Sequence, residues 1–426
     1  MRSGGRVFRT RRAIGPGARR GLARCMATVA LVTLCAPAAQ AEGEPTVDSG
    51  PCTFPNKPYA GRPWPLQRVL LDELWAQATG KGVTVAVIDS GVDVTHPQLR
   101  TAVSTTGGHN FLGAVGKRKN PTRNGTADPV GHGTKVAGII AARPHPGTGF
   151  TGLAPGATIL PLVQNDDDNN GDADTLAKAI KYAVDRRAQV INISQNVTAS
   201  QQPTPELRRA LDLALGRNVV VVASAGNDGA DGAPKPGYPA SHPGVLAVAS
   251  SDRNNERAYF SQSGGFVGIA APGTDIVSTV PRGGHCTDSG TSFSAPYVAA
   301  VAALLKEKHG GWSGKQIVTH LQQTAERSGP GPDPLTGWGV IDPVRALTQD
   351  EPEPGTRPVP DSGPPKRRAA LLTPARQGET PQEHAARLAT YTLLGTGAAV
   401  AALVAGAVAL RDARRRGRRT PGDRPA

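Results

Sequence analysis

The chain of 426 residues carries a formal net charge of +14 and contains only 4% aromatic residues. The positive charge lies at the two ends: residues 1–24 hold eight arginines and no acid, and residues 411–426 contribute +5, which leaves +1 for everything between. The composition therefore gives no support to nucleic-acid binding, and the nearly neutral middle of the chain is long enough for one sizeable core.

The N-terminal residues predict an export signal over residues 1–41. A basic start is followed by the apolar stretch CMATVALVTLCAPAA and then by Ala39-Gln40-Ala41, a small-x-small cleavage site before Glu42. This order is typical of a signal peptide, and a buried N-terminal helix is the alternative. Residues 42–66 are rich in Pro and Gly, and we expect them to form an extended arm.

Residues 67–348 predict an α/β domain in which a mainly parallel, twisted sheet carries helices on both faces. Short apolar runs predict strands at Val83–Ile88, Ile159–Val163, Val190–Ile193, Val219–Ala223 and Val245–Ala249. Helical patterns between them lie at Lys135–Ala142, Thr175–Arg186 and Pro205–Leu215. This alternation of strands and helices is typical of a parallel sheet.

Three polar segments of this domain are candidates for chemistry, and each has a plain structural alternative. Asp89 ends the first strand in DSGVD, where an acid is either functional or a turn former. His132 lies between two glycines in GHGT, which let other groups approach the imidazole, although it is equally a helix-capping position. Asn227 ends ASAGN, where its amide N–H either stabilises an oxyanion or belongs to a turn.

The segment GTSFSAP places Ser292 at the start of a long apolar run. Hydroxyls in this position are typical of a helix cap, but a Ser at a helix N-terminus also gains from the helix dipole and the free N–H groups. A nucleophilic Ser needs a base that takes its proton and an acid that orients the base. Asp89, His132 and a Ser of this segment can form such a set, because the ends of parallel strands lie at one edge of a sheet.

In the order DSGVD, GHGT, ASAGN, GTSFSAP, the chain resembles the subtilisin-like serine proteases, or subtilases, over about residues 67–348. VINIS, YPASHPGVLAVAS and GWGVIDPVRAL also fall where this family has comparable segments. The resemblance implies a subtilisin-like serine endopeptidase that acts on protein substrates, without a cofactor or a metal. It implies that Asp89 orients the general base His132, that Ser292 is the nucleophile, and that Asn227 donates to the oxyanion.

The same resemblance places substrate-binding residues at Ser194, Gln195, Asn196, Ser224, Ala225 and Gly226. Many subtilases have Leu-Gly where this chain has Gln195-Asn196, so the family's preference for large apolar residues does not carry over. The loop QNDDDNNGDAD over residues 164–174 is similar to half of a calcium loop, but Ala177 stands where an EF-hand needs Glu. We expect a solvated acidic loop there.

The C-terminal part predicts a membrane anchor. Residues 349–390 begin with a run rich in Pro, Glu and Asp and predict a stalk without a core. Residues 391–410 carry no charge, and at about 1.5 Å per residue they span a hydrocarbon layer of about 30 Å. The Arg-rich residues 411–426 predict a cytoplasmic tail and a catalytic domain outside the membrane, with a buried core helix as the alternative to the span.

Two of the four cysteines, Cys25 and Cys35, lie in the predicted signal peptide. Cys52 and Cys286 remain in an exported, oxidising setting, where a single disulfide is the natural interpretation and two free thiols are the alternative. A disulfide would fasten the arm to the loop ahead of Ser292.

A signal peptide, a short Cys-bearing arm, a subtilase domain, a Pro-rich stalk and one C-terminal span together resemble the mycosins. These are membrane-anchored proteases of type VII secretion systems in actinobacteria. The resemblance implies a single-pass protein of the cell membrane, an arm that packs around the catalytic domain, and association with a membrane secretion complex. Two functions remain: a protease that cleaves secreted proteins, or a scaffold of the complex in which proteolysis is secondary.

Overall fold

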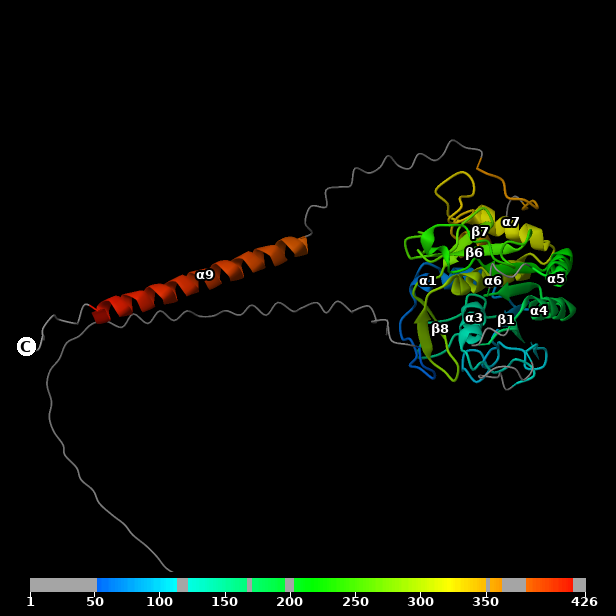
Figure 1. Ribbon diagram of the computed structural model, residues 1–426, viewed down its shortest axis with the longest axis horizontal. Helices are drawn as coiled ribbons and strands as arrows, with labels where there is room; N and C mark the ends of the chain where they lie inside the picture. Colours follow the sequence, from blue (N-terminus) through cyan, green and yellow to red (C-terminus); the bar gives the residue numbers. More distant parts are fainter. Residues whose placement is uncertain are drawn as a thin grey trace, which may run out of the picture. The chain divides into compact units, whose positions relative to one another are not determined.

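The computed structural model describes residues 52–112, 122–166, 171–195, 203–349, 353–361 and 381–416. The predicted signal peptide, Asn196, the middle of the acidic loop, most of the stalk and the end of the tail lie outside these residues. Within them, seven parallel strands in the order β2-β3-β1-β4-β5-β6-β7 form the central sheet of an α/β domain (Figure 1). The mainly parallel sheet is the one that the sequence predicts.

The strands of this sheet are short and buried, as expected for parallel strands. Their bounds are β1 Thr84–Asp89, β2 His109–Asn110, β3 Thr158–Val163, β4 Val190–Ile193, β5 Val220–Ser224, β6 Leu246–Ser251 and β7 Val267–Pro272. Each of the five predicted strands agrees with its counterpart to within two residues at either end. A separate antiparallel hairpin joins β8 (Ile276–Thr279) to β9 (His285–Asp288).

Alternate residues of the strands contribute to two core layers. In β1, Val85 and Val87 belong to the layer that contains α3 (His132–Ala141) and α6 (Thr291–Lys308). Ala86 and Ile88 belong to the layer that contains α4 (Ala173–Asp185) and α5 (Pro205–Gly216). Because side chains alternate along a strand, one short apolar run supplies both faces of the sheet. The two pairs of helices therefore cover opposite faces (Figure 1).

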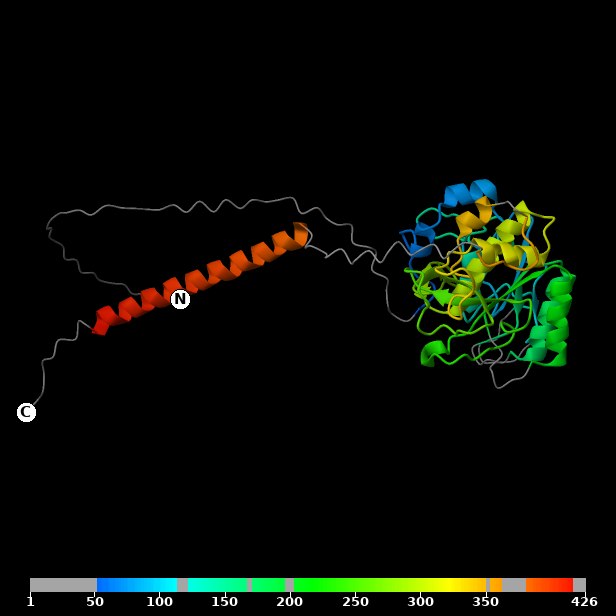
Figure 2. The ribbon, with the colours of Figure 1, turned by 90° about the horizontal axis from the view of Figure 1, so that it is seen from above.

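Smaller helices complete the domain. They are α1 Trp64–Gln67, α2 Leu71–Gln77, η1 Gly229–Asp231, α7 Gly314–Thr324 and α8 Pro343–Thr348. Figure 2 shows the first residues of the domain, in blue, next to the yellow and orange C-terminal helices. Trp64 and Leu66, near the end of the predicted arm, are buried in the main core.

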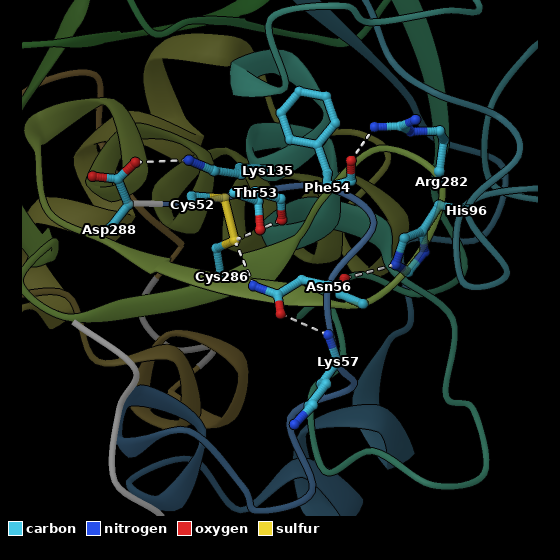
Figure 3. Close-up of a disulfide and its surroundings, with 11 residues drawn as sticks. Cys52, Thr53, Phe54, Asn56, Lys57, His96, Lys135, Arg282, Cys286 and Asp288 are labelled. Atoms are coloured by element: carbon cyan, nitrogen blue, oxygen red, sulfur yellow. Dashed lines mark hydrogen bonds and ion pairs between the residues drawn. A yellow bond between two sulfur atoms is a disulfide. The ribbon is translucent and has the colours of Figure 1, made fainter. Parts of the chain in front are cut away.

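The preceding arm is fastened to the domain at β9 and at the turn before it (Figure 3). A disulfide joins Cys52 to Cys286, whose Cα atoms are 5.8 Å apart. The side-chain amide of Asn56 donates to Cys286 Sγ over 3.2 Å, and its backbone N–H donates to the carbonyl of Gly283 over 3.0 Å. Gly284 is needed for this approach, because a Cβ there would lie 1.8 Å from the Asn56 carbonyl oxygen. The predicted pairing is present, and the described part of the arm packs on the domain.

The C-terminal part begins with a segment that contacts the domain. In residues 353–361, Glu353 accepts a hydrogen bond of 2.9 Å from Gln316, and Asp361 forms an ion pair of 2.6 Å with Arg327. The last helix, α9, spans Pro381–Arg416. Its segment Leu388–Arg411, with a mean hydropathy of 2.1, is long and apolar enough to cross a membrane, and it includes the predicted span 391–410.

Candidate active site

Three neighbouring strands of the sheet end beside one another at the edge where the predicted site residues lie. Asp89 is the last residue of β1, Ser194 follows β4, and Ser224 ends β5 three residues before Asn227. Since β1, β4 and β5 are adjacent and parallel, their carboxyl ends form one polar rim. The first turns of α3 and α6 approach the same rim with His132 and Ser292.

Asp89 and His132 form a direct hydrogen bond across this edge. His132 Nδ1 lies 2.8 Å from Asp89 Oδ1 and 3.0 Å from Oδ2. The Asp89 side chain is 4% exposed, whereas the imidazole is 33% exposed. A carboxylate can only accept, so the proton of the neutral imidazole is on Nδ1 and Nε2 is left as an acceptor. The half-buried ring therefore keeps a free basic nitrogen.

The glycines around His132 allow the close approach that the sequence predicts. A Cβ at Gly133 would lie 2.1 Å from the carbonyl oxygen of Gly91 and 3.1 Å from Asp89 Oδ1. Gly131 has a φ of +88°, a value that side chains with a Cβ rarely adopt. Gly133 is therefore required by the packing of α3 against the end of β1, and Gly131 by its backbone conformation.

The surroundings of His132 favour its protonated form. Burial alone lowers the pKa of the imidazole, but the charge of Asp89, its hydrogen bond and the charge of Asp128 outweigh burial and raise the pKa above its ordinary value of 6.5. Lys135 acts in the opposite direction. The arrangement can therefore accept a proton at Nε2 and stabilise the resulting imidazolium.

Ser292 lies in the first turn of α6, and Ser194 holds that turn. Pro296 has no N–H, so the carbonyl of Ser292, four residues earlier, has no helical donor. The Ser194 hydroxyl donates to that carbonyl over 2.9 Å. In return, the Ser292 hydroxyl donates to the Ser194 carbonyl over 2.9 Å. Transfer of this proton to His132 therefore requires rotation of the Ser292 side chain.

Asn227 is oriented by the residue before Ser292. Its Oδ1 accepts hydrogen bonds of 3.0 Å from both the backbone N–H and the hydroxyl of Thr291. The Thr291 hydroxyl in turn accepts a hydrogen bond of 3.2 Å from the N–H of Gly226. Because the amide oxygen is held in this way, the Nδ2 group of Asn227 is left to donate elsewhere.

The residues predicted to bind substrate have different surroundings. Ser194 is buried and bonded to Ser292 as described. The side-chain amide of Gln195 donates to the side chain of Gln164, at the end of β3. Ser224 and Ala225 are buried, and the N–H of Gly226 donates to the Thr291 hydroxyl. Asn196 lies outside the described residues, and these six assignments stay predictions.

Two further polar residues, Ser90 and Asp128, lie against the site without having been singled out in the sequence. Both are buried, and the Ser90 hydroxyl contacts the carboxylates of Asp89 and Asp128. The sequence around His132 does indicate such a residue. α3 begins at a glycine that has no side chain to cap the helix, so another acceptor has to satisfy the first N–H groups of the helix. The buried acid in ADPVGHGT is that acceptor.

Among the described residues, no group of three or more His, Cys, Asp or Glu side chains is placed to hold a metal ion. Part of the acidic loop 164–174 is outside these residues.

The chain is similar in sequence to known proteins. Residues 80–339 match the model of the subtilase family. Mycosin-1 of Mycolicibacterium smegmatis is 35% identical over 355 residues, covering 71% of this chain and 76% of its own. Subtilisin BL of Lederbergia lenta is 37% identical over 280 residues, covering 66% of this chain and 96% of its own.

Solved structures give the same assignment. The crystal structure of MycP1 from Mycobacterium smegmatis has a TM-score of 0.61 and 33% identity, covering 78% of this chain and 92% of that one. The MycP3 protease from the type VII (ESX-3) secretion system has a TM-score of 0.59 and 33% identity, covering 70% and 90%. The chain belongs to the subtilase family as a mycosin-type, subtilisin-like serine endopeptidase.

Proposed function

We propose that the chain is a membrane-anchored serine endopeptidase that cleaves proteins outside the cytoplasmic membrane, in association with a type VII secretion system. The observation that carries the proposal is the hydrogen bond of 2.8 Å between His132 and Asp89, on the sheet edge that also bears Ser292 and Asn227. The likeness to mycosin-1 and to MycP3, a protease of a type VII system, supports the cellular role.

In this mechanism His132 is the general base and Asp89 orients it. The Ser292 hydroxyl turns from the Ser194 carbonyl to His132 Nε2 and gives up its proton as its oxygen attacks the carbonyl carbon of the scissile peptide bond. The imidazolium then protonates the leaving amine, and an acyl-enzyme remains. Water, activated by the same imidazole, attacks the ester carbonyl and releases the acid product.

The negative oxygen that forms in each attack needs donors. The Nδ2 group of Asn227 and the backbone N–H of Ser292 supply them in this proposal, and the bonds from Thr291 to Asn227 Oδ1 keep the amide turned the right way. Because these groups are fixed before the reaction, they stabilise the oxyanion without reorganisation.

The anchor in this proposal is the segment Leu388–Arg411, whose 24 residues extend about 36 Å as a helix. Arg414, Arg415 and Arg416 follow within the same helix and keep that end on the cytoplasmic side. The catalytic domain, which precedes the span, then lies outside, where the disulfide between Cys52 and Cys286 persists.

Labelling with a fluorophosphonate probe tests the chemistry. The wild-type chain should be labelled at Ser292, Ser292→Ala should not be labelled, and Asn227→Ala should turn over peptide substrates about 10²–10³-fold more slowly. Ser289→Ala is a matched control, since this exposed neighbouring hydroxyl accepts from the N–H of Asp275, away from His132. Labelling of Ser292→Ala at wild-type rate would refute the assignment.

The scaffold alternative is tested by secretion. Mass spectrometry of secreted proteins should reveal cleaved products that disappear in Ser292→Ala. If secretion and product patterns are unchanged in Ser292→Ala but fail when the whole protein is deleted, the structural role dominates and proteolysis is secondary.

A further inference from the structure

We propose that Asp128 is a positioning residue for His132: its buried carboxylate fixes the first turn of α3 against the Asp89 segment and places a second negative charge near the imidazole. This inference rests on the proposed function, in which His132 accepts the proton of Ser292. Asp128 lies four residues before His132 and is not used in any step of the mechanism given above.

The Asp128 carboxylate is 4% exposed and is surrounded by donors. Its Oδ1 accepts from the N–H groups of Val130 (3.1 Å) and Gly131 (2.8 Å) and from the Ser90 hydroxyl (2.9 Å). Its Oδ2 accepts from the N–H (2.8 Å) and the hydroxyl (2.7 Å) of Thr134. These bonds satisfy the N–H groups at the start of α3 that the helix itself cannot satisfy.

The same bonds favour the ionised form of the carboxyl group. The Thr134 hydroxyl accepts from the N–H of Asp93 over 3.0 Å, so its own proton points to Asp128. The three N–H groups can only donate, and a proton on either carboxyl oxygen would meet at least one of them. Burial and the charge of Asp89 raise the pKa of Asp128 above its ordinary value, and the hydrogen bonds from Thr134 and Gly131 limit that rise.

Ser90 connects this carboxylate to Asp89 and to His132. Its hydroxyl lies 2.9 Å from Asp128 Oδ1 and 3.2 Å from Asp89 Oδ1, and it accepts from the N–H of Gly133 over 3.0 Å. The residues on both sides of His132 are therefore held: Gly131 directly by Asp128, and Gly133 through Ser90. A shift of Asp128 would move the backbone that carries the imidazole.

The charges that face His132 come from three elements. Asp89 lies at the end of β1, Asp128 in the loop before α3, and Lys135 in α3 itself, where it is paired with Asp288 of β9 over 2.8 Å. Asp89 and Asp128 both favour the imidazolium, and Lys135 disfavours it. Because the imidazole becomes charged when Ser292 attacks, a second carboxylate stabilises the charge that forms in that step.

The test is the rate of fluorophosphonate labelling as a function of pH, measured on the full-length chain in detergent. Labelling requires neutral His132, so the rate rises with pH along an acid limb. Asp128→Asn removes the charge and presents an NH₂ group to donors. We expect its acid limb to move to lower pH and its plateau rate to fall by about tenfold to a hundredfold.

Two variants separate positioning from a purely structural role. Thr134→Val removes the two hydrogen bonds of the Thr134 hydroxyl, with Asp128 and with the N–H of Asp93, but keeps the Asp128 charge, so its melting temperature should fall while its acid limb stays at the wild-type pH. Asp128→Glu keeps the charge and should restore the wild-type acid limb with a reduced plateau rate. The inference would be overturned if the acid limb of Asp128→Asn lay at the wild-type pH. It would also be overturned if the acid limb of Thr134→Val moved as far as that of Asp128→Asn.

If Asp128→Asn does not fold, Asp128→Glu tests the inference by itself. A plateau rate of Asp128→Glu equal to that of the wild type would exclude a positioning role for Asp128. A wild-type chain that is not labelled at Ser292 would instead refute the proposed function.

Discussion

Two histidines of the same domain, His132 and His285, have opposite protonation behaviour because they face different partners. His132 contacts the carboxylate of Asp89, and its pKa is raised. His285, on β9, has its Nε2 2.8 Å from the amide oxygen of Gln98 and accepts at Nδ1 from the N–H of Tyr59 over 3.1 Å. Burial, followed by the charges of His96 and His145, lowers its pKa to about 3.

Partner chemistry, more than burial, decides the function of each ring. Burial disfavours the charged form of both histidines, but only His132 has a carboxylate that compensates. His285 is 6% exposed and has the neutral tautomer that joins Tyr59 of the arm to Gln98. One histidine is therefore suited to carry a proton, and the other to hold the arm in place.

Removal of the Asp89 carboxylate, the partner of His132, should have the largest effect on activity. Asp89→Asn loses the acceptor that fixes the Nδ1 tautomer, so we expect kcat to fall about 10⁴-fold. The wild-type acid limb should lie above pH 6.5, because the raised pKa keeps His132 charged to higher pH, and Asp89→Asn should move the limb down.

The measurement for Asp89→Asn is kcat/KM of a peptide substrate against pH. Asp93→Asn is the control, since that buried acid of the same segment contacts Thr95 and Arg282 instead of His132. A limb that moves equally in both variants would contradict the specific role of Asp89.

Gln98→Glu introduces a carboxylate opposite His285 and so removes the difference in partner between His132 and His285. The Gln98 amide donates to the carbonyls of Arg143 and Phe150, so Gln98→Glu leaves both carbonyls facing a buried carboxylate. We expect the free energy of unfolding at pH 7 to fall by about 3–5 kcal/mol. Acidification toward pH 5 should recover stability as the introduced carboxyl group is protonated, which thermal unfolding at several pH values would show.

Gln98→Met is the control for that variant, because it removes the same hydrogen bonds without a charge. It should be less stable than the wild type at every pH and should not recover on acidification. A Gln98→Glu chain that loses stability on acidification as the wild type does would show that the new carboxylate does not govern His285.

Removal of His285 itself should have a smaller effect, visible in the pH dependence of stability. Its folded pKa of about 3 lies below the ordinary 6.5, so its contribution is present above pH 6.5 and is lost as pH falls toward 3. At pH 4.5 the loss amounts to about 2–3 kcal/mol. His285→Gln should therefore show a smaller decrease in melting temperature between pH 7 and pH 4.5.

The ring centroid of His96 lies 5.8 Å from that of His285, and burial lowers the pKa of His96 as well. Some acid sensitivity of the folded state should therefore remain in His285→Gln. An unchanged difference in melting temperature between the two pH values would place the acid sensitivity elsewhere. The protonation of the ring in the folded wild type is checked by nuclear magnetic resonance of the His285 side chain through the same pH range.

The sequence predicts the strands well because short runs of Val, Ile and Ala admit few other structures. Thus Val190–Ile193 is placed without error, and β1 and β5 are displaced by one residue. The sequence prediction omits β2, β7, β8 and β9. β2 and β9 are short and largely polar, β8 has only two apolar residues before Ser278 and Thr279, and β7 contains Gly268 and Pro272, so none of them carries a continuous apolar run. The predicted span 391–410 agrees within three residues with the helical segment Leu388–Arg411, which is long and apolar enough to cross a membrane, because such a segment needs only length and composition.

The fold, the family and the candidates Asp89, His132, Asn227 and Ser292 follow from the sequence alone, because they depend on local pattern and on order along the chain. The neighbours of these residues depend on the folded domain. Three contacts join residues that are distant in the chain and are brought together by the sheet edge and the disulfide: Ser194 with Ser292, Ser90 with Asp128, and Tyr59 with His285. Charge states follow from such contacts, and contacts between distant segments exist only when the chain has folded.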